Sequence, residues 1–317
     1  MGIKGLTQLI KQHAPDAIET TNLHKLSGKT VAIDASLFMY KMLINMRGKN
    51  DGYLKNEEGK VVSHITGIFY KTTNYLAVNI TPIYVFDGKP PQNKDGVLKD
   101  RHDKVANAKA AMENNNLTEE QKNKLEKQTI RLTKEHVDDI KNLLTLMGVS
   151  YVQADGEAEA YASEMCRKGK VDYVVTEDMD TMTFGCPKMI RTCLDKSIKR
   201  ADVISIIDLE TILTKFEMSY SEFVDMCILC GCDYCASLPR VGNKTAFNHI
   251  KQLKNIESVL PKIKDVPEGY EGKYKDSRRL FTMYHDTLDI DKLDYHESEQ
   301  NLDEVFTYLT HTCGMSE

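Results

Sequence analysis

Acidic residues stand at the ends of several short apolar runs in this 317-residue chain. The run TVAID ends in Asp34, and IYVFDG places Asp87 directly after a second run. A third run, DYVVT, is followed by EDMD, which holds Asp178 and Asp180. Runs of this length and composition predict buried strands, and ligands of an open α/β sheet bind beyond the carboxyl ends of its strands. We therefore expect these acids to gather at one sheet edge.

Three further acids extend this set. Glu157 and Glu159, in GEAEA, open a helical pattern after the run VSYVQ. Residues two apart do not share a helix face, so the helical period alone does not bring these two together, although their place in the first turn allows it. Asp233 lies between two helical patterns. A single acid after a strand is more often a cap or turn residue, but this number at strand and helix ends favours a functional site.

Seven convergent carboxylates would repel one another strongly in a low dielectric. Hard divalent cations remove this repulsion, and Mg²⁺ prefers oxygen ligands while keeping some of its water. The acids therefore predict a site for one or two Mg²⁺ ions, with Mn²⁺ as a substitute.

The apolar runs that position these acids alternate with helical patterns. They span residues 30–34, 82–86, 149–153, 172–176 and 201–207. This alternation predicts an α/β fold with a twisted, mostly parallel sheet flanked by helices.

Residues 98–146 differ from the rest in being charged and thinly apolar. We expect one helix from Leu98 to Asn114 and a second, long helix running towards Leu146, with Gly148 as its stop. Thr118 with Gln121 three residues later resembles a capping box for the second helix. Helices with so little apolar surface should project from the core. The alternative is a solvated hairpin without a role.

Residues 221–256 predict a helix, a tight turn and a second helix. Between Tyr234 and Ile256 there is no acid, and the basic residues are Arg240, Lys244, Lys251 and Lys254. Gly242 precedes the second helix, whose free N–H groups could meet a phosphate. A one-sided charge run is, however, more often a solvated face.

The overall charge of −5 conceals an uneven distribution. Residues 286–317 hold nine acids against one lysine, which leaves +3 for residues 1–285. The chain shows no signal peptide or apolar stretch of transmembrane length, so its eight cysteines predict a reducing compartment and not a disulfide scaffold. Cys227, Cys230, Cys232 and Cys235 have a spacing that could suit zinc, but within an apolar pattern buried free thiols are the better interpretation.

Together these motifs resemble those of a known family. MGIKGL, VAIDAS, YVFDGKPP, GEAEAYAS, TEDMDTMTFG and GCDYCASLPRVG occur in the order seen in flap endonucleases of the eukaryotic and archaeal type. The similarity covers nearly the whole chain. It implies a single 5′-nuclease domain over residues 1–317 with a PIN-like core, a helical arch at about 90–135 and a helix–two-turn–helix at about 221–256, to which the charge distribution adds an acidic C-terminal segment at 286–317.

The resemblance implies roles for individual residues. The metal-site carboxylates would be Asp34, Asp87, Glu157 and Glu159 around the first ion and Asp178, Asp180 and Asp233 around the second, with Glu159 between them. Lys94 and Arg101 would be catalytic cations at the base of the arch. Candidate DNA contacts are Gly2, Tyr40, Arg47, Lys94, Arg101, Arg240, Gly242 and Lys244. Tyr40 would stack on a base near the scissile bond, and a potassium ion would sit at the helix–two-turn–helix.

The implied activity is two-metal cleavage of branched double-stranded DNA near the base of a 5′ flap, leaving 5′-phosphate and 3′-hydroxyl ends. The alternatives are a non-catalytic DNA-junction binder, a related metal-dependent ribonuclease, a 5′ exonuclease and a junction resolvase. We expect a monomer in the nucleus or another compartment of DNA replication, without membrane association.

The chain departs from the family pattern at two places. Arg240 stands where the family usually has glycine, which puts the potassium site in question because a non-glycine residue reaches positive φ at a cost. The family's clamp-binding motif does not occur in the sequence, so we expect no sliding-clamp binding through it.

Overall fold

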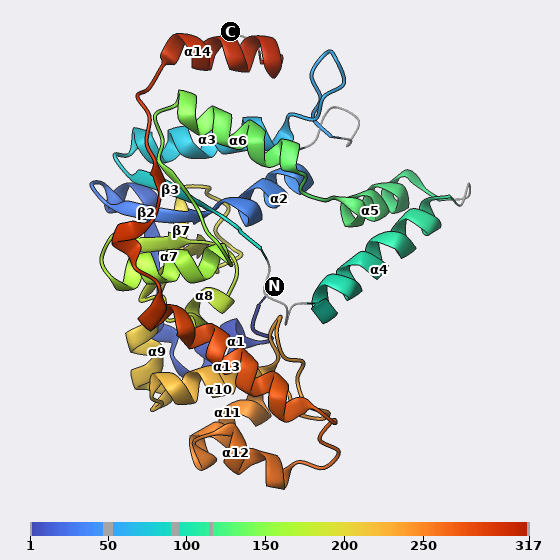
Figure 1. The fold of residues 1–317 in the computed structure, drawn as a ribbon, viewed down its shortest axis with the longest axis vertical. Helices are drawn as coiled ribbons and strands as arrows, with labels where there is room; N and C mark the ends of the chain where they lie inside the picture. The colour runs from blue at the N-terminus through green and yellow to red at the C-terminus, as the bar shows by residue number, and fades with distance from the viewer. Residues whose placement is uncertain (1, 47–52, 90–94, 114–116, 316–317) are drawn as a thin grey trace.

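The structure, a computed structural model, describes residues 2–46, 53–89, 95–113 and 117–315, and for residues 95–101 the backbone alone. Its centre is an eight-stranded sheet (Figure 1) with the order β1-β7-β6-β5-β2-β3-β4-β8. The strands are β1 (Ile18–Asn22), β2 (Thr30–Asp34), β3 (Thr81–Phe86), β4 (Tyr151–Gln153), β5 (Tyr173–Val175), β6 (Lys188–Thr192), β7 (Val203–Asp208) and β8 (Tyr295–His296).

The five strands from β6 to β4 in this order are parallel, whereas β1, β7 and β8 pair antiparallel at the two sides. The prediction of an α/β fold with a mostly parallel sheet is confirmed. The five predicted runs correspond to β2, β3, β4, β5 and β7. The sequence analysis missed β1, β6 and β8, whose sequences IETTN, KMIRT and YH are too polar or too short to form an apolar run.

Fourteen α-helices are present among the described residues. They are α1 (Leu6–His13), α2 (Ala35–Asn45), α3 (Ser63–Ala77), α4 (Asp95–Met112), α5 (Glu119–Thr129), α6 (Lys134–Leu146), α7 (Ala158–Arg167), α8 (Asp180–Thr183), α9 (Leu209–Phe216), α10 (Tyr220–Cys230), α11 (Asn243–Leu253), α12 (Ile256–Val259), α13 (Tyr270–Thr287) and α14 (Leu302–Thr307). Within the part of the chain that the structure describes, none of these helices has the length and apolar character needed to cross a bilayer.

Two apolar cores lie on opposite faces of the sheet. Along β2, Val31 and Ile33 belong to the core beneath α2, α3 and α6, whereas Ala32 belongs to the core beneath α1, α7 and α10. Successive residues of a strand point to opposite faces, so a strand buried on both sides reads as the continuous apolar run seen in the sequence. This burial on both faces fixes the strand ends that carry the acids.

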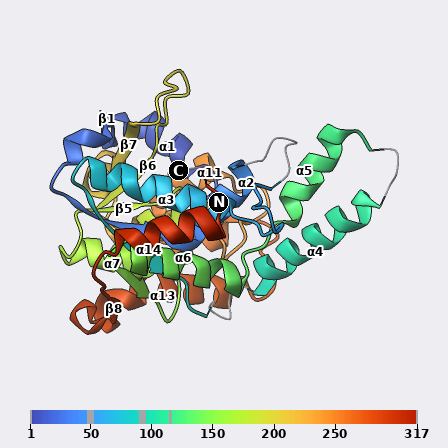
Figure 2. The same ribbon diagram turned by 90° about the horizontal axis from the view of Figure 1, so that it is seen from above.

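Helices α4 and α5 contact each other and stand away from the rest of the molecule (Figure 2). Between them they bury little, since only Val105 and Ala108 of α4 are buried among their described side chains and α5 buries none. The capping box at Thr118 and Gln121 is confirmed, with Thr118 Oγ1 accepting from Gln121 N and Gln121 Oε1 accepting from Thr118 N.

The prediction of one continuous helix to Leu146 is wrong, because the chain breaks between α5 and α6. Ile130 leaves the helical conformation (ψ 132°), and its side chain is only 2% exposed at the cavity lining. Thr133 then starts α6 with a second capping box, in which its Oγ1 accepts from His136 N. The expected stop at Gly148 is present, with φ +65°.

Helices α10 and α11 contact each other and flank a turn of residues 231–242. Arg240, in this turn, has φ +63°, a conformation that costs a non-glycine residue about 1 kcal/mol or more. The exposed Arg240 therefore adopts the backbone geometry of a glycine at this position. Gly242 is the N-cap of α11.

Candidate active site

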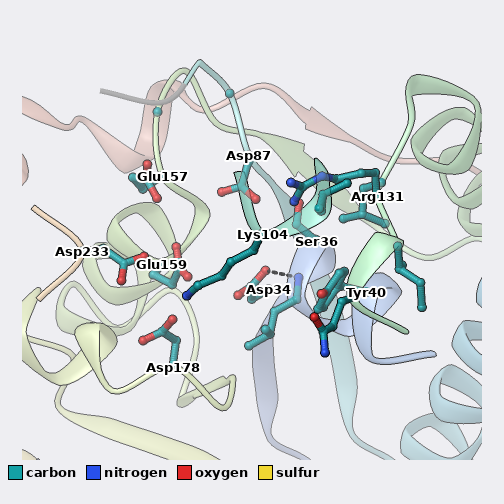
Figure 3. Close-up of a pocket in the computed structure, with 17 residues that line it drawn as sticks. Asp34, Ser36, Tyr40, Asp87, Lys104, Arg131, Glu157, Glu159, Asp178 and Asp233 are labelled. Atoms are coloured by element: carbon teal, nitrogen blue, oxygen red, sulfur yellow. Dashed lines mark hydrogen bonds between the residues drawn. The ribbon is translucent and has the colours of Figure 1, made fainter. Parts of the chain in front are cut away.

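A cavity of about 630 Å³ lies at the carboxyl ends of the parallel strands, next to the α4–α5 hairpin (Figure 3). Six of the seven predicted acids line it: Asp34, Asp87, Glu157, Glu159, Asp178 and Asp233. The strand-end argument therefore holds for Asp34, Asp87 and Asp178, which come from three different strands.

Asp34 joins the end of β2 to the start of α2. As the N-cap of α2, its Oδ1 accepts a hydrogen bond of 3.0 Å from Leu37 N. Its Oδ2 accepts a longer bond, 3.4 Å, from Thr176 Oγ1 just beyond β5. The same hydroxyl oxygen accepts from Asp178 N at 3.1 Å, so Thr176 links the acids of two neighbouring strands.

Asp87 and the start of α7 are held together by the backbone. Gly88 N donates to Gly156 O at 2.7 Å, and a Cβ at Gly88 would collide with the backbone of Asp155. Asp87 Oδ1 in turn accepts from Ala158 N, at 2.8 Å, in the first turn of α7.

This pairing brings Glu157 and Glu159 to one point with Asp87. One carboxylate oxygen of each of the three acids lies within 4.8 Å of the others, a grouping that could hold a metal ion. Glu157 is the N-cap of α7, with extended backbone (ψ 129°), and so is not bound by the helical period that separates residues two apart. The N-cap position of Glu157 therefore explains how two acids only two residues apart in GEAEA reach the same point.

Asp178 and Asp180 follow β5 and are both nearly buried, at 7% and 4% exposure. Asp180 N donates to Asp178 Oδ1 at 3.1 Å, which turns the segment into α8. Asp180 does not line the cavity itself but lies behind Asp178. Gly2 is packed against both residues, because a Cβ there would collide with the Asp178 carboxylate and come within 2.9 Å of Asp180 N.

The pKa values of two carboxyl groups at the cavity are raised. Burial, together with the charges of Asp87 and Asp178, raises the pKa of Asp34 to about 8. Burial and the neighbouring acids, Asp34 foremost, also raise the pKa of Glu159 well above its ordinary value. Carboxyl groups that resist ionisation next to one another, with oxygen as the only donor type, fit a hard divalent cation.

Two basic residues at the cavity were missed by the sequence analysis. Lys104 extends from α4 into the group of acids, and Arg131 lies at the cavity wall in the break between α5 and α6 (Figure 3). A signal for Lys104 was present, because it stands three residues after Arg101 and so shares its helix face. Arg131 had no such signal, since its position depends on the chain break.

The other predicted contacts have different locations. Tyr40 of α2 lines the cavity. Arg240, Gly242 and Lys244 lie at the α10–α11 turn and the start of α11, and not at the cavity lining. Arg47 and Lys94 fall outside the described residues, as does the side chain of Arg101 on α4.

The four cysteines of the 227–235 segment are buried. Burial is the main cause that raises the pKa of the Cys227, Cys230 and Cys232 thiols. Neutral thiols in an apolar core act as small hydrophobic side chains.

Comparison with known proteins agrees with this architecture. The XPG N-terminal domain matches residues 1–108, and the XPG I-region matches residues 148–233. Flap endonuclease 1-A of Sorghum bicolor is 39% identical over 325 residues, covering all of this chain and 84% of that protein. Flap endonuclease 1 of Debaryomyces hansenii is also 39% identical, covering all of this chain and 85% of its own.

Solved structures show the same fold. Flap endonuclease-1 from Methanococcus jannaschii superposes with a TM-score of 0.69 at 26% identity, over 93% of this chain and 90% of that one. The catalytic core of Rad2 in complex with DNA substrate superposes with a TM-score of 0.72 at 21% identity, over 99% and 96% of the two chains. By the sequence matches over its whole length, the chain belongs to the flap endonuclease family of structure-specific 5′ nucleases.

Proposed function

We propose that this protein cuts the phosphodiester near the base of 5′ flaps in branched DNA by magnesium-dependent hydrolysis, leaving a 5′-phosphate and a 3′-hydroxyl. The observation that carries the proposal is the cavity in which six carboxylates from distant segments meet beside a projecting helical hairpin. A nuclease needs such a concentration of oxygen ligands, whereas a protein that only binds DNA gains nothing from repelling phosphates there.

Asp34, Asp87, Glu157 and Glu159 would hold one Mg²⁺, and oxygens of the last three already lie close together. Asp178, Asp180 and Asp233 would hold a second, with Glu159 between the two groups. Bound ions of this kind supply a nucleophilic water at neutral pH and offset charge on the attacking and leaving oxygens. The carboxylates would fix the positions of the ions.

Cations from the hairpin would neutralise the substrate. Lys104, in the middle of α4, and Arg131, just after α5, both line the cavity, so a phosphate held over the acids would meet positive charge from the hairpin side. The family resemblance adds Lys94 and Arg101 to this role. Tyr40, at the cavity wall, offers an aromatic face on which a base near the scissile bond could stack.

The duplex would be gripped at the α10–α11 turn. Gly242 and the first residues of α11 present backbone N–H groups, with the exposed Arg240 and Lys244 beside them. Contacts of this kind read the DNA backbone and not its sequence, so recognition would depend on the shape of the branched substrate. A potassium ion at the turn belongs to the same proposal.

Cleavage of a 5′-end-labelled double-flap DNA in Mg²⁺, by the wild type and by Asp180→Ala, tests this function. We expect one cut near the flap base with the wild type and no cut with the variant, although both bind the DNA. If neither protein cuts while binding is intact, the nuclease proposal fails and the junction-binding interpretation replaces it.

A further inference from the structure

Residues 2–5, which we call the N-terminal strap, connect the acidic site to the α10–α11 turn. At one end, Gly2 packs against Asp178 and Asp180. In the middle, Lys4 N donates to Gly231 O at 3.1 Å, two residues before Asp233. The strap therefore touches both segments that carry the second group of acids.

The far end of the strap is Gly5, the N-cap of α1, whose carbonyl accepts from Gln8 N and Leu9 N. One side chain also connects it to α11. Asn243, the first residue of α11, donates from Nδ2 to Gly5 O at 3.1 Å, and its Oδ1 accepts from Lys244 N at 3.0 Å. The orientation of this amide is unambiguous, because a carbonyl oxygen can only accept and a backbone N–H can only donate.

The contact between Asn243 and Gly5 is close-fitting. A Cβ at Gly5 would lie 2.6 Å from Asn243 Cγ, so the asparagine fills the space against the glycine. Gly2 and Gly5 both have positive φ, +79° and +73°. The bonds from Gln8 N and Leu9 N fix the Gly5 carbonyl relative to α1, and the bond from Asn243 fixes the same carbonyl relative to α11.

We propose that Asn243 is a positioning residue for the nuclease reaction: by holding Gly5, it sets how Gly2 packs against Asp178 and Asp180. It thereby couples the helix proposed to grip the duplex to the acids proposed to hold the metal. This inference rests on the proposed function, although the mechanical link itself does not.

The substitution Asn243→Asp isolates this contact. Aspartate has the same size and keeps the acceptor for Lys244 N, but it cannot donate to Gly5 O. An acid in the first turn of a helix is favoured by the helix dipole, so α11 should not be weakened. Asn248→Asp, an identical change at an exposed position of the same helix, is the matched control for the added charge.

Three measurements are needed: hydrogen exchange of the strap amides in metal-free, DNA-free protein, the thermal midpoint, and the single-turnover cleavage rate at saturating double-flap DNA. For Asn243→Asp we expect the Lys4 amide to exchange at least about tenfold faster and cleavage to slow about tenfold, the size of effect that slight misplacement of a reacting group produces. The thermal midpoint should be unchanged or raised. Asn248→Asp should match the wild type in exchange and in cleavage rate.

Two results would overturn the proposal. Unchanged exchange in the strap would show that Asn243 does not hold it, whether or not the protein cuts DNA. Faster exchange with a cleavage rate equal to that of Asn248→Asp would show that the strap does not position the site. If the wild type did not cut at all, the proposed function would fail, while the exchange data would still decide whether Asn243 holds the strap.

Discussion

Replacing Asp34 by asparagine should stabilise the metal-free protein while removing its response to metal. Asp34 is 2% exposed and faces Asp87 and Asp178. Asparagine removes the charge but retains the acceptor that caps α2 through Leu37 N, and asparagine is as good an N-cap as aspartate. The substitution therefore changes the electrostatics and leaves the local structure in place.

The magnitude follows from the raised pKa of Asp34. The carboxyl has an ordinary pKa of 3.8 when the chain is unfolded and a pKa of about 8 in the folded protein. Between these values the unfolded chain has lost the proton and the folded chain keeps it, so raising the pH favours unfolding. At about 1.4 kcal/mol per pKa unit, the metal-free wild type should lose as much as about 5 kcal/mol of stability between pH 4 and pH 8. The Asp34→Asn variant should not show this loss of stability, because asparagine does not titrate.

Urea denaturation in EDTA at pH 4, 6 and 8 measures the effect. The free energies of unfolding should be similar at pH 4, and Asp34→Asn should be the more stable protein at pH 8. In saturating Mg²⁺ the wild type should be the more stable protein, because an ion bound by the folded state stabilises it. The variant should bind the ion more weakly, since it has lost the negative charge of the Asp34 carboxylate. An Asp34→Asn protein that is less stable than the wild type at pH 8 in EDTA would refute the claim that the acids repel one another.

Three further changes test other parts of the structure. Lys104→Ala should slow single-turnover flap cleavage about 10- to 100-fold, because it removes a cation that extends into the group of acids. Lys109→Ala, outside the cavity lining, should leave the rate unchanged, and equal rates for the two variants would count against a role for Lys104. Arg240→Gly should raise the free energy of unfolding by roughly 1 kcal/mol in urea by relieving a left-handed φ, and a loss of stability would show that its side chain matters more. Arg278→Met should lower the free energy of unfolding by about 3–5 kcal/mol in the same assay, since the buried Asp225 carboxylate loses its two 2.7 Å hydrogen bonds from Arg278. An unchanged free energy of unfolding would contradict the importance of that pair.

The sequence predicted the parallel strands and their acids well, because both follow from local patterns. A strand buried on two faces must be apolar throughout, and Asp34, Asp87 and Asp178 stand where such runs stop. The edge strands β1 and β8 escaped detection, since their polar or very short sequences carry no such pattern.

Features that depend on tertiary contacts could not be predicted in this way. The charged composition of residues 117–146 predicts one helix, whereas the chain leaves the helix at the buried Ile130 and begins a new one at the Thr133 cap. Arg131 reaches the cavity because of that break. The hydrogen bond from Asn243 to Gly5 joins residues 238 positions apart, and no pattern within the sequence connects them.

The most direct test of the central claim is the location of the metal ions. Anomalous diffraction from crystals grown with Mn²⁺ should show one ion within the group Asp34, Asp87, Glu157 and Glu159, and a second bound by Asp178, Asp180 and Asp233. Strong Mn²⁺ peaks elsewhere, with none at these carboxylates in crystals of cleavage-competent protein, would contradict the account.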